Sequence, residues 1–253
     1  MDRPAVMPPV GIAYGDDPSQ FGELHRPAGT PRGVVVVIHG GFWRAAYDLT
    51  LGTPLAAALA AEGWAAWNLE YRRVGTGPGG GGGAPRTLDD VAAGLDRLRG
   101  PDLGLDLSTV LTLGHSAGGH LAAWAASRTR FAAWAGGVAV TGVVSQAGVL
   151  DLRAAHAAAL GDGAAAAFLG HPPTGADAAA DPAQQLPLEV PLVCVHGRDD
   201  TIVPIDQSEG YVARAGAAGA SARLVAVDGD HFTVVDTASA AWATTLDVLA
   251  DLA

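Results

Sequence analysis

The sequence predicts a doubly wound α/β fold around a mostly parallel sheet, and two observations lead to this prediction. Continuous apolar runs rich in Val, Leu and Ala recur along the chain, as in strands that are buried on both faces. Ala- and Leu-rich stretches with helical spacing separate these runs, so strand and helix alternate. The chain has 253 residues with 49% hydrophobic side chains. We therefore expect 1–253 to form one domain with a large core.

Six apolar runs are expected to form the strands of this sheet. The first, 33–38, reads Gly-Val-Val-Val-Val-Ile and stops at His39-Gly40-Gly41, which is typical of a strand in the middle of a parallel sheet. The other expected strands are 64–71, 109–113, 137–145, 191–196, which contains the only cysteine, Cys194, and 222–227. The expected helices are about 53–62, 87–99, 117–127, 206–217 and 236–252.

Two segments interrupt the alternation. The five glycines 79–83 cannot hold one backbone conformation without outside contacts, so they predict a mobile loop, either a surface connection or a border of the site. Residues 150–187 carry short alanine-rich helical pieces followed by a Pro/Ala/Asp-rich stretch. This segment is either a small lid or an irregular crossover.

Charge and composition exclude several classes of partner. The chain has no lysine, and its 15 arginines stand against 26 acidic residues, for a net charge of −11. Such a surface repels phosphate backbones, so nucleic acid is not an expected partner. No signal-peptide core and no apolar run of about 18 residues occurs. We therefore expect a cytoplasmic protein without a membrane partner. The sequence makes no prediction of the oligomeric state.

The pattern Gly-x-Ser-x-Gly at 114–118 predicts a nucleophile. It follows the apolar run 110–113 and precedes the helical stretch 117–127, which is the strand–turn–helix context of a nucleophile elbow. The sharp turn would present the hydroxyl of Ser116 at the carboxyl edge of the sheet, and the helix would direct backbone N–H groups toward developing negative charge.

A serine needs a general base, and the base needs a carboxylate that fixes its tautomer. Two adjacent candidates for the carboxylate, Asp199 and Asp200, follow the expected strand 191–196. Of the eight histidines, His231 alone lies in a turn-rich loop after the last strand, so it is the expected base. His25, His156 and His171 are expected at the surface. No metal-ligand spacing occurs, so neither a metal nor another cofactor is expected.

The tetrahedral intermediate also requires donors to its oxyanion. The loop His39-Gly40-Gly41-Phe42-Trp43 follows the first expected strand, and its glycines allow close approach of the backbone. We assign the N–H groups of Gly41 and Ala117 to the oxyanion hole, with Phe42 as a further donor. Phe42 and Trp43 are expected either to wall the substrate pocket or to belong to the core. Arg72 and Arg73 are expected to pair with Glu70 or nearby aspartates.

These motifs together resemble the α/β-hydrolase superfamily over about residues 11–250. Within it, the sequence is similar to the kynurenine formamidase (arylformamidase) and small-esterase branch, with a departure from hormone-sensitive-lipase-like esterases at Phe42, where those have a third glycine. The resemblance implies that Asp200, three residues after Gly197 and before Val203-Pro204, is the acid. The matching motifs are His39–Trp43, Gly114–His120, Asp200–Pro204, Gly229–Phe232 and the N-terminal Tyr14–Gln20.

The expected function is hydrolysis of small carboxylic esters through an acyl-enzyme, with Ser116, Asp200 and His231 as the triad and a small-molecule ester or amide as the partner. Hydrolysis of N-formylkynurenine by an arylformamidase is the alternative that the resemblance implies. A non-catalytic binding protein on the same fold is a remote alternative.

Overall fold

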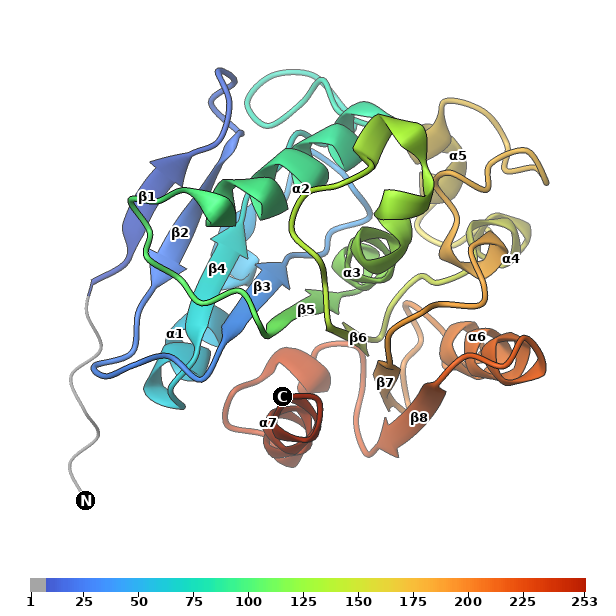
Figure 1. The fold of residues 1–253 in the computed structure, drawn as a ribbon. Coiled ribbons are helices and arrows are strands. Elements are labelled where there is room, and N and C mark those ends of the chain that lie inside the picture. The colour runs from blue at the N-terminus through green and yellow to red at the C-terminus, as the bar shows by residue number, and fades with distance from the viewer. Residues whose placement is uncertain (1–7) are drawn as a thin grey trace.

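The computed structural model describes residues 8–253. The expectation that the N-terminus has no signal-peptide core falls partly on residues 1–7, which lie outside the described residues. One eight-stranded sheet organises the chain, in the order β1-β2-β4-β3-β5-β6-β7-β8 (Figure 1). The strands are β1 (Val10–Ala13), β2 (Phe21–His25), β3 (Val34–Ile38), β4 (Ala65–Leu69), β5 (Val110–His115), β6 (Gly142–Gln146), β7 (Leu192–Gly197) and β8 (Ala222–Val227). The α-helices are α1 (Thr53–Ala61), α2 (Arg86–Asp96), α3 (Ala117–Ser127), α4 (Leu152–Ala157), α5 (Ala164–Leu169), α6 (Asp206–Ala217) and α7 (Ala240–Asp251).

The predicted doubly wound, mostly parallel sheet is confirmed. Strands β4, β3, β5, β6, β7 and β8 pair in parallel, and each corresponds to one of the apolar runs. The antiparallel pair β1–β2, which joins the sheet at β4, is absent from the prediction. Its strands are short, and β1 is largely exposed, so neither carries a continuous apolar run.

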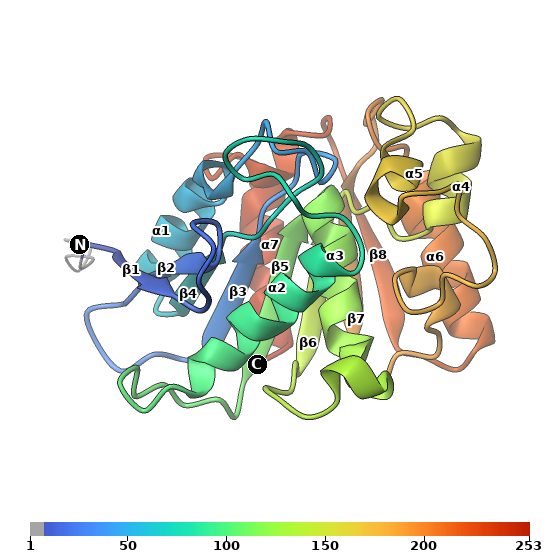
Figure 2. The same cartoon turned by 90° about the horizontal axis from the view of Figure 1, so that it is seen from above.

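Helices cover both faces of the sheet. Helices α1 and α7 lie on one face, whereas α2, α3 and α6 lie on the other (Figure 1). The apolar side chains of each set belong to a separate core cluster with the sheet. All five residues of β3, β4 and β6 are buried, as expected for central strands between two helical layers. Because the parallel strands share one direction, the loops that follow them gather at one edge of the sheet (Figure 2).

Two expectations from the sequence are corrected. Strand β6 begins at Gly142 rather than at 137, because Gly137 has a φ of +78° and the amide of Val138 donates to Asp96 Oδ1 instead of to a strand. His25, expected at the surface, is only 2% exposed on β2.

The glycine run 79–83 adopts a defined conformation because the neighbouring backbone supplies the contacts that it lacks on its own. The amide of Arg73 donates to Gly79 O at 2.8 Å, and the amide of Gly82 donates to Arg73 O at 2.7 Å. A Cβ at Gly82 would lie 2.2 Å from Arg72 O, so only glycine fits this close approach.

Residues 150–187 pack against α3. Their ordered elements are the short helices α4 and α5 and a 3-10 turn at Pro182–Gln184. His120 Nε2 and Trp124 Nε1, both on α3, donate to the carbonyls of Ala180 and Ala179 at 2.7 and 2.9 Å. Two buried side chains of α3 therefore hold the irregular backbone of this segment. Among residues 8–253, no helix has both the length and the apolar character needed to cross a bilayer.

His120 makes the stability of the protein sensitive to acid. It is fully buried, and burial lowers the pKa of His120 to about 4. The unfolded chain protonates at the usual histidine value of about 6.5, so below that pH the unfolded state binds more protons than the folded state. His120 alone therefore removes about 1.4 kcal/mol of stability per pH unit as the pH falls, and this loss levels off near the folded pKa.

We predict that His120→Gln reduces the dependence of the unfolding free energy on pH between pH 6 and 4.5 by about one proton. Urea unfolding at several pH values measures this dependence. His171→Gln, at an exposed histidine with half of its side-chain surface accessible, is the matched control for the loss of a histidine. An unchanged slope in His120→Gln would contradict the prediction.

Candidate active site

The turn between β5 and α3 places Ser116 in a strained conformation. Its φ of +56° and ψ of −119° are unfavourable for a residue with a Cβ, at about 1–3 kcal/mol. Backbone contacts compensate: the amide of Ser116 donates to Gln146 O at 2.9 Å, and the carbonyl of Ser116 accepts from Gly119 and Val149. The strain is therefore held by β6 and by the first turn of α3.

Two glycines permit this turn, because another part of the backbone passes so close to each of them that a side chain would not fit. A Cβ at Gly114 would lie 2.0 Å from Gly118 O, and a Cβ at Gly118 would lie 2.0 Å from Ile38 O. Such distances exclude any side chain. The glycines of the Gly-x-Ser-x-Gly pattern thus serve the close approach of β5, α3 and the end of β3, as the motif predicts.

Of the two aspartates after β7, the structure places Asp200 against the histidine. Asp200 Oδ2 lies 2.6 Å from His231 Nδ1, and its side chain is inaccessible to solvent. Asp199 is exposed, and its amide donates to Gly229 O. A carboxylate at Nδ1 keeps the proton on that nitrogen and leaves Nε2 free to act as a base.

The surroundings of Asp200 keep it ionised. Burial opposes ionisation, but hydrogen bonds from His196, His231 and the amide of Val203 outweigh it and hold the pKa of Asp200 below its usual range. Asp200 Oδ1 accepts from the amides of Ile202 and Val203, each at 2.9 Å. The carboxylate can therefore stabilise a positive charge on His231.

His115 contacts His231, the expected base, directly. Its Nε2 lies 2.9 Å from His231 O and must donate there, and the two rings are 4.5 Å apart. Burial lowers the pKa of His115 to about 3, and His231 acts in the same direction, so His115 remains neutral. This contact fixes the backbone of the loop that carries His231.

The candidate oxyanion donors lie in the β3–α1 loop and at the start of α3. Gly41, with a φ of +106°, and Phe42, with a φ of +51°, both have left-handed backbone. Neither amide donates to another described residue. A Cβ at Gly41 would lie 2.5 Å from the side chain of Tyr47, so the loop requires glycine there. Ala117 begins α3, where N–H groups lack intrahelical partners.

A cavity of about 200 Å³ joins these groups. Its wall includes Ser116, His231, Gly41 and Phe42, together with apolar side chains from β3, α1 and the loops after β7 and β8. Among the described residues that line it there is no Arg, Asp or Glu. Within residues 8–253, no group of three or more His, Cys, Asp or Glu side chains could hold a metal ion.

Trp43 does not line this cavity, contrary to one of the two roles considered for it. It is 1% exposed, and its ring stacks on Phe168 at 4.7 Å and meets His120 edge-on at 5.1 Å. Residues 150–187, which include Phe168, contribute no lining residue either. Through Phe168, this segment packs against the loop that carries Trp43.

Several residues around the site carry no motif that identifies them from sequence. Glu70, Tyr71 and Arg73 form a buried polar cluster behind the candidate oxyanion loop, in line with the expected pairing of Arg73 with Glu70. The only available signal is the run Glu-Tyr-Arg-Arg immediately after a buried strand. His196, on β7, contacts Asp200 Oδ2 at 3.2 Å.

The comparisons with known proteins agree with this architecture. The family model described as BD-FAE matches residues 24–214, which is more than half of the chain. Esterase LipC of Mycobacterium tuberculosis is 26% identical over 230 residues, covering 83% of this chain and 55% of LipC. The chain thus spans about half the length of this relative.

Solved structures of esterases have the same fold. Esterase B of Lactobacillus rhamnosis superposes with a TM-score of 0.81 at 25% identity, covering 96% of this chain and 83% of that one. A truncated carbohydrate esterase from gut microbiota superposes with a TM-score of 0.79 at 20% identity, covering 99% of both chains. These relatives do not confirm the kynurenine formamidase branch.

Replacing each aspartate separately tests the carboxylate. We predict that Asp200→Asn lowers kcat on a p-nitrophenyl ester by about 10⁴-fold, because an amide there favours the wrong tautomer of the histidine. Asp199→Asn, at an exposed position, is the matched control and stays within about twofold of wild type. Equal losses in both variants would contradict the assignment.

Proposed function

The chain belongs to the BD-FAE family, and from this membership and the geometry of the site we propose that it is a serine hydrolase that cleaves small carboxylic esters through an acyl-enzyme intermediate. One observation carries the proposal. The strained Ser116 and His231 come from separate loops and line a single apolar cavity, and Asp200 contacts His231 Nδ1 from behind it. The names of LipC and esterase B as esterases support the same reaction.

In the proposed mechanism, His231 Nε2 removes the proton from Ser116 as the hydroxyl attacks the ester carbonyl. The amides of Gly41, Phe42 and Ala117 donate to the oxyanion. His231 then protonates the leaving alcohol, and water attacks the acyl-enzyme with His231 again as the base. Asp200 remains ionised throughout and stabilises the imidazolium.

The lining of the cavity favours an ester over N-formylkynurenine. The latter carries an ammonium and a carboxylate, and burying either without a partner is unfavourable by several kcal/mol. The cavity offers no Arg, Asp or Glu to pair with them. A neutral ester has no such penalty. A binding protein without catalysis has no need of a strained serine beside a histidine–carboxylate pair.

The apolar surface continues from the interior of the cavity to its mouth. The inner wall consists of buried side chains such as Ile38 and Leu55, a setting suited to an acyl chain. A cavity of about 150 Å³ admits a benzene ring, so the present one has room for an acyl group of about six carbons. Four of the large exposed apolar residues lie at the mouth: Tyr47, Leu51, Ile202 and Phe232. We infer that the alcohol side of the substrate is also apolar.

Removing the nucleophile tests the reaction class. We predict that Ser116→Ala reduces turnover of p-nitrophenyl butyrate to near the uncatalysed rate. The melting temperature should stay close to that of the wild type, because alanine also has a Cβ and keeps the same backbone strain. The ratio of kcat/KM for this ester to that for N-formylkynurenine, measured in the wild type, separates the two candidate substrates. Undiminished turnover in a folded Ser116→Ala variant would refute the proposal.

Narrowing the cavity tests the acyl site. Val235, half-buried in the turn after β8, lines the cavity. We predict that Val235→Phe lowers kcat/KM for a hexanoate ester about tenfold relative to acetate, because one or two methylenes lose their space. Val212→Phe, on α6 and away from the cavity, is the matched control, and its chain-length profile should equal that of the wild type. An unchanged profile in Val235→Phe places the acyl chain elsewhere.

A further inference from the structure

A buried carboxylate lies behind the candidate oxyanion loop. Glu70 directly follows β4 and is 4% exposed. We propose that Glu70 is a positioning residue that fixes the β3–α1 loop, and with it the amides of Gly41 and Phe42, relative to Ser116. This inference rests on the proposed function, because it assigns a role in the same reaction.

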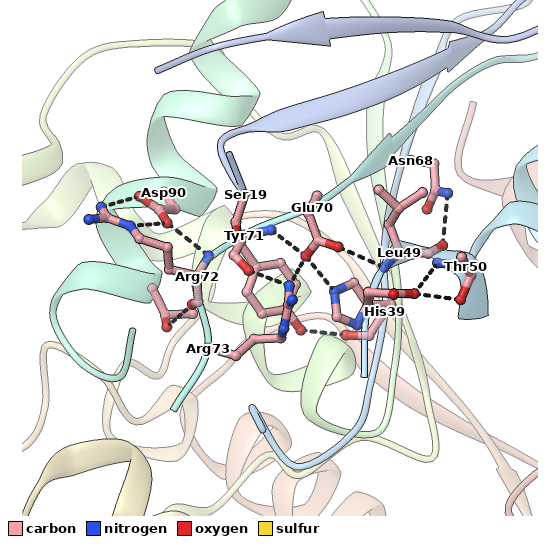
Figure 3. A network of polar contacts seen from close by, with 12 residues as sticks. Ser19, His39, Leu49, Thr50, Asn68, Glu70, Tyr71, Arg72, Arg73 and Asp90 are labelled. Atoms are coloured by element: carbon pink, nitrogen blue, oxygen red, sulfur yellow. Dashed lines mark hydrogen bonds and ion pairs between the residues drawn. The ribbon is translucent and has the colours of Figure 1, made fainter. Parts of the chain in front are cut away.

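Four donors converge on the two oxygens of Glu70 (Figure 3). The amide of Leu49 donates to Oε2 at 2.9 Å. Oε1 accepts from the amide of Tyr71 at 2.8 Å, lies 3.2 Å from His39 Nε2, and pairs with the guanidinium of Arg73. The carboxylate is thus fully engaged, and its charge is balanced by a buried cation.

The proton of His39 belongs on the side of Glu70. Burial lowers the pKa of His39 to about 3, and the nearby Arg73 acts in the same direction, so the ring is neutral and has one N–H. Its two nitrogens face Glu70 Oε1 and Gly40 O. A lone pair directed at a carboxylate is more repulsive than one directed at a carbonyl. His39 therefore carries its proton on Nε2 and donates to Glu70.

These contacts secure the loop at both ends. His39 is its first residue after β3, and Leu49 is where its 3-10 turn begins before α1. Gly41 and Phe42 lie between them. Tyr71 assists at the first end, because its hydroxyl donates to His39 O at 2.7 Å and its ring stacks on the imidazole at 4.4 Å. The side chain of Glu70, directly after β4, thus contacts both ends of the segment that carries Gly41 and Phe42.

Asp90, on α2, provides a matched comparison. It is fully buried and accepts from Arg72 N, Nε and Nη2 at 2.9, 2.8 and 2.6 Å (Figure 3). Gln20 also donates to it. Its described partners do not include any residue of the β3–α1 loop. Asp90→Asn therefore disturbs a similarly buried carboxylate that pairs with an arginine, without touching that loop.

Two variants of Glu70 test the proposal. Glu70→Gln places an NH2 group where one oxygen stood, so the donors at one end of the loop lose their acceptor. Glu70→Asp keeps the charge opposite Arg73 but is too short to reach both ends. We expect each to lower kcat for p-nitrophenyl butyrate by about 10- to 100-fold, since misplaced oxyanion donors act on the transition state. KM should change by less than about threefold, because ground-state binding does not use these donors.

Hydrogen exchange of the 39–49 segment provides a readout independent of turnover. We expect faster exchange in both Glu70 variants than in Asp90→Asn, which should also keep kcat within about twofold of wild type. Wild-type kcat in a folded Glu70 variant, or an equal loss in Asp90→Asn, would overturn the proposal. If the wild-type protein hydrolyses no ester, the proposed function fails, and exchange alone decides whether Glu70 fixes the loop.

Discussion

The close meeting of three backbone segments around Ser116 is the constraint from which the site follows. The β5–α3 turn passes so near the end of β3 that neither Gly114 nor Gly118 has room for a Cβ. That proximity brings the loop after β3 beside Ser116, so the candidate oxyanion donors of Gly41 and Phe42 and the candidate nucleophile line the same cavity. A parallel sheet provides this arrangement because all its strands end at one edge.

Buried charge around the site is arranged in satisfied pairs. Glu70, Asp90 and Asp200 are all nearly inaccessible, and each accepts several hydrogen bonds from neighbouring groups. The first two pair with arginine, and the third is held by histidines and amides. Such full engagement offsets the desolvation that an isolated buried carboxylate would suffer. The cavity itself has no Arg, Asp or Glu among the described residues that line it.

The sequence predicts those elements whose signal lies within a short, continuous stretch of residues. Continuous apolar runs identified the six parallel strands, and the Gly-x-Ser-x-Gly pattern identified the strand–turn–helix around Ser116. Strands β1 and β2 were missed because both are short and neither carries a continuous apolar run. The adjacent Asp199 and Asp200 could not be separated from local residues, because only the distance to His231, fixed by the pairing of β7 with β8, distinguishes them. Glu70 meets His39 and Leu49 through the β3–β4 register, which is likewise invisible in the sequence.

Trp43 shows how the core supports a loop of unfavourable conformation. Gly41, Phe42 and Trp43 are three consecutive residues with positive φ, and the two that are not glycine are strained by about 1–2 kcal/mol each. Burial of a tryptophan side chain contributes about 4–6 kcal/mol, which exceeds that strain. Because Trp43 is packed on Phe168, the residues before it are held in this left-handed conformation. Trp43 therefore acts as an anchor of the candidate oxyanion loop, whereas Phe42, next to it, lies on the wall of the cavity.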